Sequence, residues 1–340
     1  MEKMIVKTSP HFSSKQTTRN IMLDVIIALV PAFLFGIYNF GIASLIQVAL
    51  SIGSCVLGEF LFNKIAKKEN TLKDLSAIVS GLILGLNLPC TAPFYVSIVG
   101  GIFAMMLIKC LFGGLGKNFV NPAIAARVFL LITWASAMTT FVKPIYGLDQ
   151  LFKYVPNIFN SSISVRTGAT ALAIETSKVG GRALAYRMNK ANLLDLFIGR
   201  VGGTVGETSV IAILAGGIYL GVRKVINPVI PLSVLGSAAL FTLIVTGDAA
   251  TILPSLCSGG LMFGAIFMAT DYATSPNSLV GQIIFGVGIG LITILIRAFA
   301  TLPEGVSYAI LLMNLFVPII DKYVVRKPFG YEKPQKGGNK

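Results

Sequence analysis

The chain has 340 residues, of which 54% are hydrophobic and only 12% are charged, with a formal net charge of +14. A soluble domain of this length carries about twice that fraction of charged residues, so the composition excludes an ordinary soluble protein and indicates an integral membrane protein. Basic residues mark cytoplasmic loops and contact anionic lipid headgroups of the bilayer, so the positive charge requires no nucleic acid as a partner.

Apolar segments close to the roughly 20 residues that cross a bilayer as a helix recur ten times. They fall into two groups of five: 20–38, 42–62, 75–90, 94–113 and 120–142, then 208–223, 229–247, 257–272, 280–300 and 305–321. The pattern predicts an all-α membrane protein with four parts. These are an N-terminal cytoplasmic segment with the first five-helix repeat (1–142), a polar external loop (143–207), a second five-helix repeat (208–321) and a cytoplasmic tail (322–340).

Orientation follows from the basic residues, because short loops rich in Lys and Arg stay in the cytoplasm. Short loops near 39–41, 91–93 and 248–256 contain no Lys or Arg. The opposite side is basic, with Lys3, Lys7, Lys15, Arg19, Lys64, Lys67, Lys68, Lys73, Lys117, Arg223, Lys224 and the tail residues Lys322, Arg326, Lys327, Lys333, Lys336 and Lys340. Both termini are therefore expected in the cytoplasm and the long loop outside. That loop is itself basic, but loops of its length largely escape the rule.

Several charged and polar residues lie inside or beside the first-half spans. Pairing with Arg19 or Lys64, or snorkelling, is the favoured interpretation for Asp24 and Glu59. Asn121 and Arg127 open the fifth span, and for Arg127 a functional and a structural role are equally open.

The long loop contains the sequence Thr167-Gly168-Ala169-Thr170, preceded by Arg166. Glycine and alanine leave the backbone sterically open, so a modifying enzyme can reach the threonine hydroxyl. The motif suggests a covalent attachment point, although such a short match alone is more often an ordinary exposed loop.

The second half opens with Gly206-Glu207-Thr208-Ser209, which reads as a helix start with an acidic residue in its first turn. Later, Ser258-Gly259-Gly260 and Pro276 flank the eighth span as Ser80-Gly81 and Pro89 flank the third. Glycine and proline at corresponding places predict broken helices at a repeat interface, and five spans per half make the repeats inverted. Asp271 lies at the end of the eighth span, and for it a functional and a structural role are equally open.

Metal and histidine chemistry are not expected. The four cysteines, Cys55, Cys90, Cys110 and Cys257, lie singly without Cys-x-x-Cys spacing, and His11 is the sole histidine. A multi-histidine metal site and histidine-based catalysis are therefore implausible, and no catalytic residue is assigned.

Taken together, these motifs resemble the D subunits of Rnf complexes, which are membrane-bound ferredoxin:NAD oxidoreductases. The chain is similar, more distantly, to the B subunits of sodium-pumping NADH:quinone oxidoreductases. The resemblance covers essentially the whole chain and rests on four motifs in order: Asn121-Pro122-Ala123 through Arg127, Thr167 to Thr170, Gly206 to Ser209, and Gly259-Gly260 through Asp271 and Pro276.

The resemblance implies that a flavin transferase esterifies FMN to Thr170, with Arg166, Arg182 or Arg187 close enough to screen the phosphodiester. It also implies a second, non-covalent flavin, riboflavin, among the spans. Asn121, Asp271 and Thr274 are candidates to border riboflavin or a sodium path, and Glu207 and Thr208 are candidates to contact flavin.

The function implied is electron transfer from ferredoxin toward NAD, coupled to outward transport of sodium ions or protons across a bacterial or archaeal cell membrane. Expected partners are the flavin-bearing G subunit, the iron-sulfur B and C subunits and the membrane A and E subunits. No nucleotide-binding glycine motif is present, so partner subunits are expected to bind NADH and ferredoxin. The alternatives are an inverted-repeat solute channel or transporter without a redox cofactor, and a purely structural scaffold.

Overall fold

The protein is described from a computed structural model over residues 17–68, 71–144, 192–300 and 304–324. Within these ranges it is helical and contains no β-strand. The N-terminal half comprises α1 (Thr18–Phe40), α2 (Ile42–Ile65), η1 (Leu72–Asp74), α3 (Ser76–Leu86), α4 (Phe94–Ile102), η2 (Phe103–Cys110), α5 (Pro122–Thr133) and α6 (Ala135–Thr139). The C-terminal half comprises α8 (Leu193–Ile198), α9 (Val210–Val222), α10 (Val229–Thr246), η6 (Ala249–Thr251), α11 (Ile252–Cys257), α12 (Leu261–Phe263), η7 (Gly264–Met268), α13 (Leu279–Phe299) and α14 (Val306–Tyr323).

Five helices in the described part of the chain are long and apolar enough to cross a membrane, namely α1, α2, α10, α13 and α14. A sixth span results if the bent pair 249–257 and 261–268 is counted as one, and α3, α4 with η2, α5 and α9 are shorter apolar helices. The expectation of an all-helical membrane protein is confirmed, while the ten-span inverted repeat stays a prediction.

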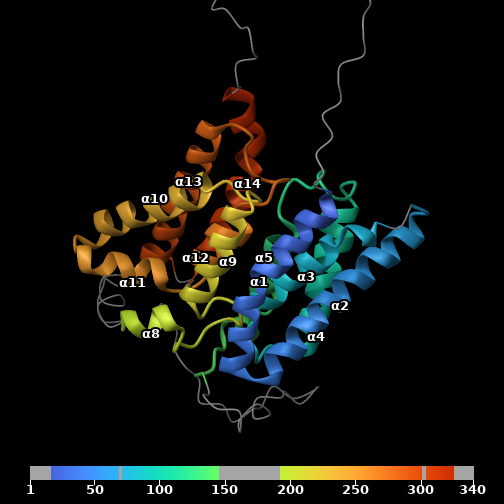
Figure 1. Cartoon of the computed structure of the whole chain (residues 1–340), viewed down its shortest axis with the longest axis horizontal. Coiled ribbons are helices and arrows are strands. Elements are labelled where there is room, and N and C mark those ends of the chain that lie inside the picture. Colours follow the sequence, from blue (N-terminus) through green and yellow to red (C-terminus); the bar gives the residue numbers. More distant parts are fainter. Residues whose placement is uncertain (1–16, 69–70, 145–191, 301–303, 325–340) are drawn as a thin grey trace, which may run out of the picture.

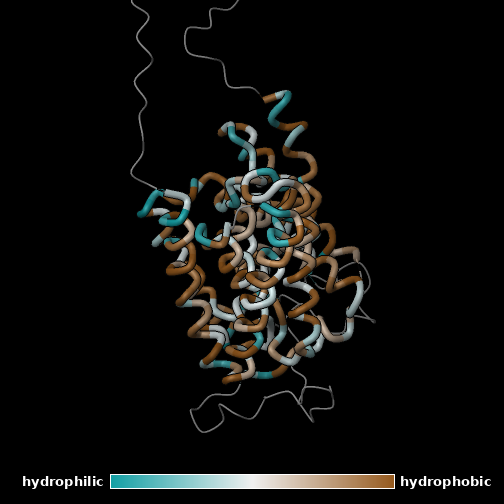
Figure 2. The backbone as a smooth tube through the Cα atoms, turned by 90° about the vertical axis from the view of Figure 1, so that its right-hand side faces the viewer, coloured by the Kyte–Doolittle hydropathy of each residue, from teal (hydrophilic) through white to brown (hydrophobic). Residues whose placement is uncertain are grey.

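The outer surface of the helices is apolar. Large hydrophobic side chains such as Leu34, Ile132 and Leu232 are more than half exposed. Figure 2 shows the hydrophobic colour over most of the helical body, with hydrophilic segments gathered toward the end from which α1 starts. Apolar surface of this extent is expected to contact lipid or partner helices.

Local chemistry sets several helix boundaries. Gly41 separates α1 from α2 with φ of 71°, a conformation that glycine adopts without strain. Asn121 caps α5 by accepting from Ala123 N, and Pro122 occupies the first helical position. Ser209 caps α9. The prediction that Glu207 lies in the first turn of that helix was wrong, because the helix starts at Val210 and Glu207 precedes the cap.

One large buried core contains residues of both halves. Helix α1 packs against α9, and α5 packs against α14, while α2 packs on α3 and α4, and α10 packs on α13. Figure 1 shows α1 beginning and α14 ending toward the same end of the molecule, with α8 at the opposite end. The two predicted breaks differ. Helix α3 is continuous and ends at Leu86, whereas segments 249–257 and 261–268 meet at a bend of 69°.

A loop from the second half fills the interruption after α3. The backbone N–H groups of Val205 and Gly206 donate to the carbonyl oxygens of Leu88 and Leu86, at 3.1 and 2.7 Å. A Cβ atom on Gly206 would lie 2.7 Å from Leu86 Cβ, so this close approach requires glycine. The contact carries Glu207 into the protein interior.

Some predicted residues lie outside the described ranges. They are Thr167, Gly168, Ala169 and Thr170, the neighbouring arginines Arg166, Arg182 and Arg187, and His11.

Candidate functional site

A large cavity lies between the halves, near the start of α1 and the ends of α9 and η7. Its empty volume is about 780 Å³, part of which is open to solvent. Apolar side chains including Met22, Ile83, Leu220 and Phe267 make most of its wall. Its polar lining residues are Ser76, Ser80, Lys109, Asn118, Asn121, Thr270, Asp271 and Tyr272. A largely apolar cavity with a few convergent polar groups is typical of a cofactor or ligand site.

Asn121 and Asp271, both predicted from the sequence, line this cavity together. Asn121 Nδ2 donates to Met268 O at 3.4 Å, which joins α5 to the end of η7. Thr274 lies behind the wall and donates to Asp271 Oδ2 at 3.1 Å, so it positions the carboxylate. Asn118 Oδ1 is buried without a hydrogen-bond partner among the described residues. An unpartnered acceptor in a cavity wall is available to a bound ligand.

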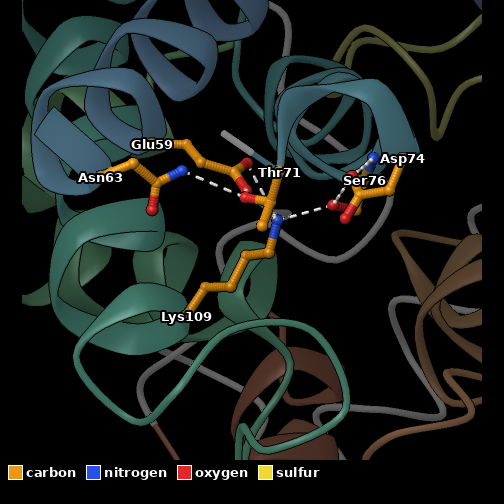
Figure 3. A network of polar contacts seen from close by, with 6 residues as sticks. All are labelled: Glu59, Asn63, Thr71, Asp74, Ser76 and Lys109. Carbon is orange, nitrogen blue, oxygen red and sulfur yellow. Dashed lines mark hydrogen bonds and ion pairs between the residues drawn. The ribbon is translucent and has the colours of Figure 1, made fainter. Parts of the chain in front are cut away.

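A buried ion pair stands beside the cavity. Lys109 Nζ donates to both carboxylate oxygens of Glu59, at 3.0 and 2.9 Å, and to Ser76 Oγ at 2.6 Å. Figure 3 shows Lys109 reaching from η2 between Glu59 with Thr71 on one side and Ser76 with Asp74 on the other. The sequence interpretation allowed Glu59 to pair with Lys64, and this partner was wrong. Lys109 also lines the cavity, so its positive charge acts both on Glu59 and on any ligand in the cavity.

A second ion pair joins the halves directly at the same end. Arg223 Nη2 lies 3.2 Å from Asp24 Oδ2, and Tyr219 Oη donates to Asp24 Oδ1 at 2.9 Å. The sequence interpretation offered Arg19 as the partner of Asp24, which was also wrong. The Asp24 side chain is 7% exposed and that of Arg223 is 54% exposed, so this pair lies at the rim of the protein core.

Arg127 is the centre of a polar cluster that joins four segments of the chain. The cluster consists of Arg127, Asn87, Glu207 and Glu304 and is here called the Arg127 cluster. Arg127 Nη1 donates to Glu207 Oε1 at 2.5 Å and to Asn87 Oδ1, and its Nη2 donates to Glu304 Oε2. Asn87 stands at the end of α3, and Glu207 and Glu304 precede α9 and α14. All but Glu304 are at least nine-tenths buried.

Two small cavities flank the Arg127 cluster. One is lined by Glu207, Thr208 and Glu304 with Leu196, Val201, Gly202, Gly203, Cys257 and Gly259. The other is lined by Arg127 and Glu304 with Leu131, Met138, Thr139, Phe141 and Tyr308. The predicted candidates Glu207 and Thr208 therefore lie apart from Asn121 and Asp271, near α8 rather than near the start of α1.

Sequence reasoning missed the residues that complete these clusters. Lys109 was visible as a lone cation within the 94–113 apolar run, and Glu304 as an acid just before the last span. Intramembrane charges usually find a partner, so each was a signal. The sequence held no sign of which carboxylate or cation would face it, because the partners lie 50 and 177 positions away.

Comparison with known proteins extends over almost the whole chain. Residues 5–330 match the sequence model of the NQR2, RnfD, RnfE family. The D subunit of the Na⁺-translocating ferredoxin:NAD⁺ oxidoreductase complex of Acetobacterium woodii is 41% identical over 335 residues, covering 98% of this chain and 97% of that protein. The D subunit of the proton-translocating ferredoxin:NAD⁺ oxidoreductase complex of Clostridium ljungdahlii is 38% identical over 333 residues, covering 96% of each chain.

More distant relatives carry a related name. The D subunit of the ion-translocating oxidoreductase complex of Haemophilus influenzae is 36% identical over 370 aligned positions, covering 99% of both chains. The relatives are thus named as subunits of oxidoreductase complexes that move ions. This chain belongs to the NQR2, RnfD, RnfE family and is similar along its whole length to the D subunits of Rnf complexes.

Proposed function

We propose that this chain is the membrane electron-transfer subunit of an ion-translocating ferredoxin:NAD oxidoreductase complex, with FMN esterified to Thr170. The observation that carries the proposal is similarity at 41% identity, over 98% of the chain, to the D subunit of a Na⁺-translocating complex. The Thr167 to Thr170 motif supplies the hydroxyl to which the flavin phosphate is attached. FMN supplies one- and two-electron chemistry, and the protein supplies its position and electrostatic surroundings.

The large cavity supports a second flavin, riboflavin, held without a covalent bond. Its apolar wall fits a planar ring system, and its polar edge offers both donors and acceptors. Asn118 Oδ1, which has no partner among the described residues, is available to a ring N–H group. In this proposal Asn118 Oδ1 and the second Nδ2 hydrogen of Asn121 bind the flavin edge. Lys109 contributes its charge alone, because its three N–H donors already bind Glu59 and Ser76. Thr274 acts indirectly by fixing Asp271.

Matching contacts in the two halves support the ten-span inverted repeat. Ser54 Oγ donates to the carbonyl oxygens of Ser51 and Ser97, and Ser237 Oγ donates to those of Val234 and Gly286. In each half a glycine four residues after the second acceptor, Gly101 or Gly290, packs against that serine. The α2–α4 and α10–α13 packings are thus built alike. The contacts of α1 with α9 and of α5 with α14 join helices that such a repeat would make equivalent.

The arrangement of charges supports cytoplasmic termini. Helix α1 begins and α14 ends toward one end of the molecule (Figure 1), where Arg19, Arg223, Lys224 and Lys322 also lie next to helix ends. Segments 143–144 and 192–207 adjoin the opposite end. Basic residues favour the cytoplasmic side, so the Thr170 segment is assigned to the outside. Outward ion transport is proposed from the resemblance to ion-translocating complexes, not from this charge distribution.

The expected partners follow from the same proposal. The relatives are named as D subunits of a complex. We therefore place this chain with flavin-bearing G, iron-sulfur B and C and membrane A and E subunits, in a bacterial or archaeal cell membrane. A transporter without a redox cofactor fits the helices equally well, but it gives no role to the Thr170 motif and does not fit the names of the relatives.

Mass spectrometry of the subunit from its native host tests the proposal. The peptide containing Thr170 is expected to carry the added mass of one FMN, and the Thr170→Ala variant is expected to lack it. Loss of ferredoxin-dependent NAD reduction in an assembled Thr170→Ala complex would distinguish a redox subunit from a scaffold. An unmodified wild-type peptide, from a host with an active flavin transferase, would contradict the flavoprotein proposal.

A further inference from the structure

Helix α14 carries a buried asparagine behind the wall of the large cavity. Asn314 is 1% exposed and does not itself line the cavity. Only one orientation of its side-chain amide satisfies both of its neighbours: Oδ1 accepts from the backbone N–H of Asn121 at 3.2 Å, and Nδ2 donates to Thr274 O at 3.1 Å. Asn314 therefore bridges the start of α5, in the first half, and the segment that follows η7, in the second half.

The bridge completes a ring that borders the polar edge of the cavity, here called the Asn314 ring. From Asn314 the ring continues through Thr274, whose hydroxyl donates to Asp271 Oδ2 at 3.1 Å. Three residues earlier in the chain, Met268 O accepts from Asn121 Nδ2 at 3.4 Å. The Asn121 backbone N–H leads back to Asn314. The ring thus connects Asn121 and Asp271, two polar residues that line the cavity from different halves.

Helix α14 gives the bridge a firm base. It packs against both α5 and η7, the two elements that the bridge connects. The contact with η7 is close, since a Cβ atom on Gly264 would lie 2.4 Å from Val306 Cγ1. Asn314 lies two turns of α14 after Val306, so its side chain is held at a fixed distance from both cavity walls.

Both bonds of the bridge go to backbone atoms. Asn314 therefore fixes where two chain segments lie relative to each other, rather than the rotamer of one neighbouring side chain. A polar side chain buried within a membrane helix is stabilised by such inter-helix hydrogen bonds. Residues that bind a ligand need support of this kind, because they must be held within about 0.5 Å of the productive geometry.

From this geometry we infer that Asn314 is a positioning residue for the flavin proposed to occupy the large cavity. It fixes the separation between Asn121 and Asp271 at the polar edge of that flavin without contacting the flavin. The inference rests on the proposed second flavin. A change at Asn314 is therefore expected to weaken retention of the flavin even though every residue of the cavity wall is kept.

Release of riboflavin from the purified whole complex measures this effect. The complex is diluted into flavin-free buffer, and free riboflavin is separated from FMN by chromatography and quantified over time. Asn314→Leu has a similarly branched side chain without hydrogen-bonding groups, and it is expected to release riboflavin about tenfold faster than wild type, as for the loss of one hydrogen bond. Thr274→Val, which removes the bond to Asp271, is expected to act in the same direction. The double variant should fall short of the product of the two single effects, because both residues belong to one ring.

Asn39 provides the matched control. Its side chain is fully buried and also bridges the halves, because Nδ2 donates to Gly199 O at 2.9 Å and to Thr208 Oγ1 at 3.3 Å. It lies outside the large cavity. Asn39→Leu is expected to lower the thermal stability of the complex about as much as Asn314→Leu does, with riboflavin release at the wild-type rate. Asn314→Ser keeps a hydroxyl that cannot reach both backbone partners, and it answers the same question if Asn314→Leu does not assemble.

The outcomes separate the positioning role from the proposed function. Release at the wild-type rate in the Asn314 variants and in Thr274→Val would overturn the inference and leave the second flavin standing. Equal acceleration in Asn39→Leu would also overturn it, because release would then follow overall stability. A wild-type complex that carries FMN on Thr170 but no riboflavin would overturn the proposed second flavin and the inference with it, while the FMN proposal would stand.

Discussion

The two halves of the chain each bury one cation in the fourth predicted span of the half, Lys109 in η2 and Arg297 in α13, but they stabilise it differently. In the first half Lys109 pairs with the Glu59 carboxylate at 2.9 Å, while in the second half Arg297 donates to the carbonyl oxygens of Ser255 and Ser258, at 2.7 and 2.9 Å. In the proposed repeat Thr242 corresponds to Glu59, because it lies five residues after Ser237 as Glu59 lies five after Ser54. The two halves therefore pack their helices in a similar way but stabilise the buried cation with different partners.

The difference follows from the chemistry of the two cations. A lysine ammonium is a compact charge, and a buried carboxylate offers it a full opposite charge. An arginine guanidinium carries five N–H donors in a planar fork and spreads its charge, so two carbonyl oxygens at an interrupted helix satisfy much of it. The first-half cation thus depends on one charged partner, with Ser76 as a neutral one, whereas the second-half cation depends on carbonyl oxygens at the break between α11 and α12.

The largest effect is expected from Lys109→Met. Glu59 would be left buried without its cation, and breaking a buried pair in this way costs about 3–5 kcal/mol. Thermal unfolding of the purified complex, or the yield of assembled complex, measures the loss. The double variant Lys109→Met/Glu59→Leu should recover most of the stability, and a double variant as unstable as the single one would contradict this interpretation of the pair.

A smaller effect is expected from Arg297→Met. No carboxylate forms a salt bridge with Arg297 in the described part of the chain, although Glu304 and Glu207 attract it at longer range. The substitution therefore leaves two carbonyl oxygens unpaired and removes this weaker attraction. The expected cost is about 1–3 kcal/mol, as for a buried acceptor that loses its donor. The same unfolding measurement applies, and a loss equal to that of Lys109→Met would remove the contrast between the halves.

The smallest effects are expected from Ser54→Ala and Ser237→Ala. Each removes one inter-helix hydrogen bond, to Ser97 O or Gly286 O, and such bonds in membrane proteins contribute about 0.6 kcal/mol on average. The two variants should destabilise the complex equally within experimental error. Unequal losses, with one serine dispensable and the other not, would show that the matching contacts do not carry matching energies.

Local sequence patterns predicted the helices well but not their partners. The glycine and proline positions predicted broken helices in the third and eighth spans. Segments 249–257 and 261–268 do meet at a bend of 69°, whereas α3 runs unbroken through Ser80 and Gly81 and ends at Leu86, before Pro89. Glu207 shows the limit: an acidic residue before a helix suggests a dipole contact, yet it binds Arg127 instead. That pairing depends on the backbone hydrogen bonds by which Val205 and Gly206 bind the end of α3. No local sequence pattern predicts such a contact.

By itself, the sequence determined membrane class, helix positions and family, because hydrophobic length, helix caps and motif order are properties of contiguous residues. The Thr167 to Thr170 motif, on which the proposed FMN attachment rests, is likewise a property of contiguous residues. Only the tertiary structure decided that Asn121 and Asp271 share one cavity, that Glu207 and Thr208 border another, and that Lys109 and Arg297 are stabilised differently. Those outcomes depend on distances between residues far apart in the chain, which are set by how the two halves pack.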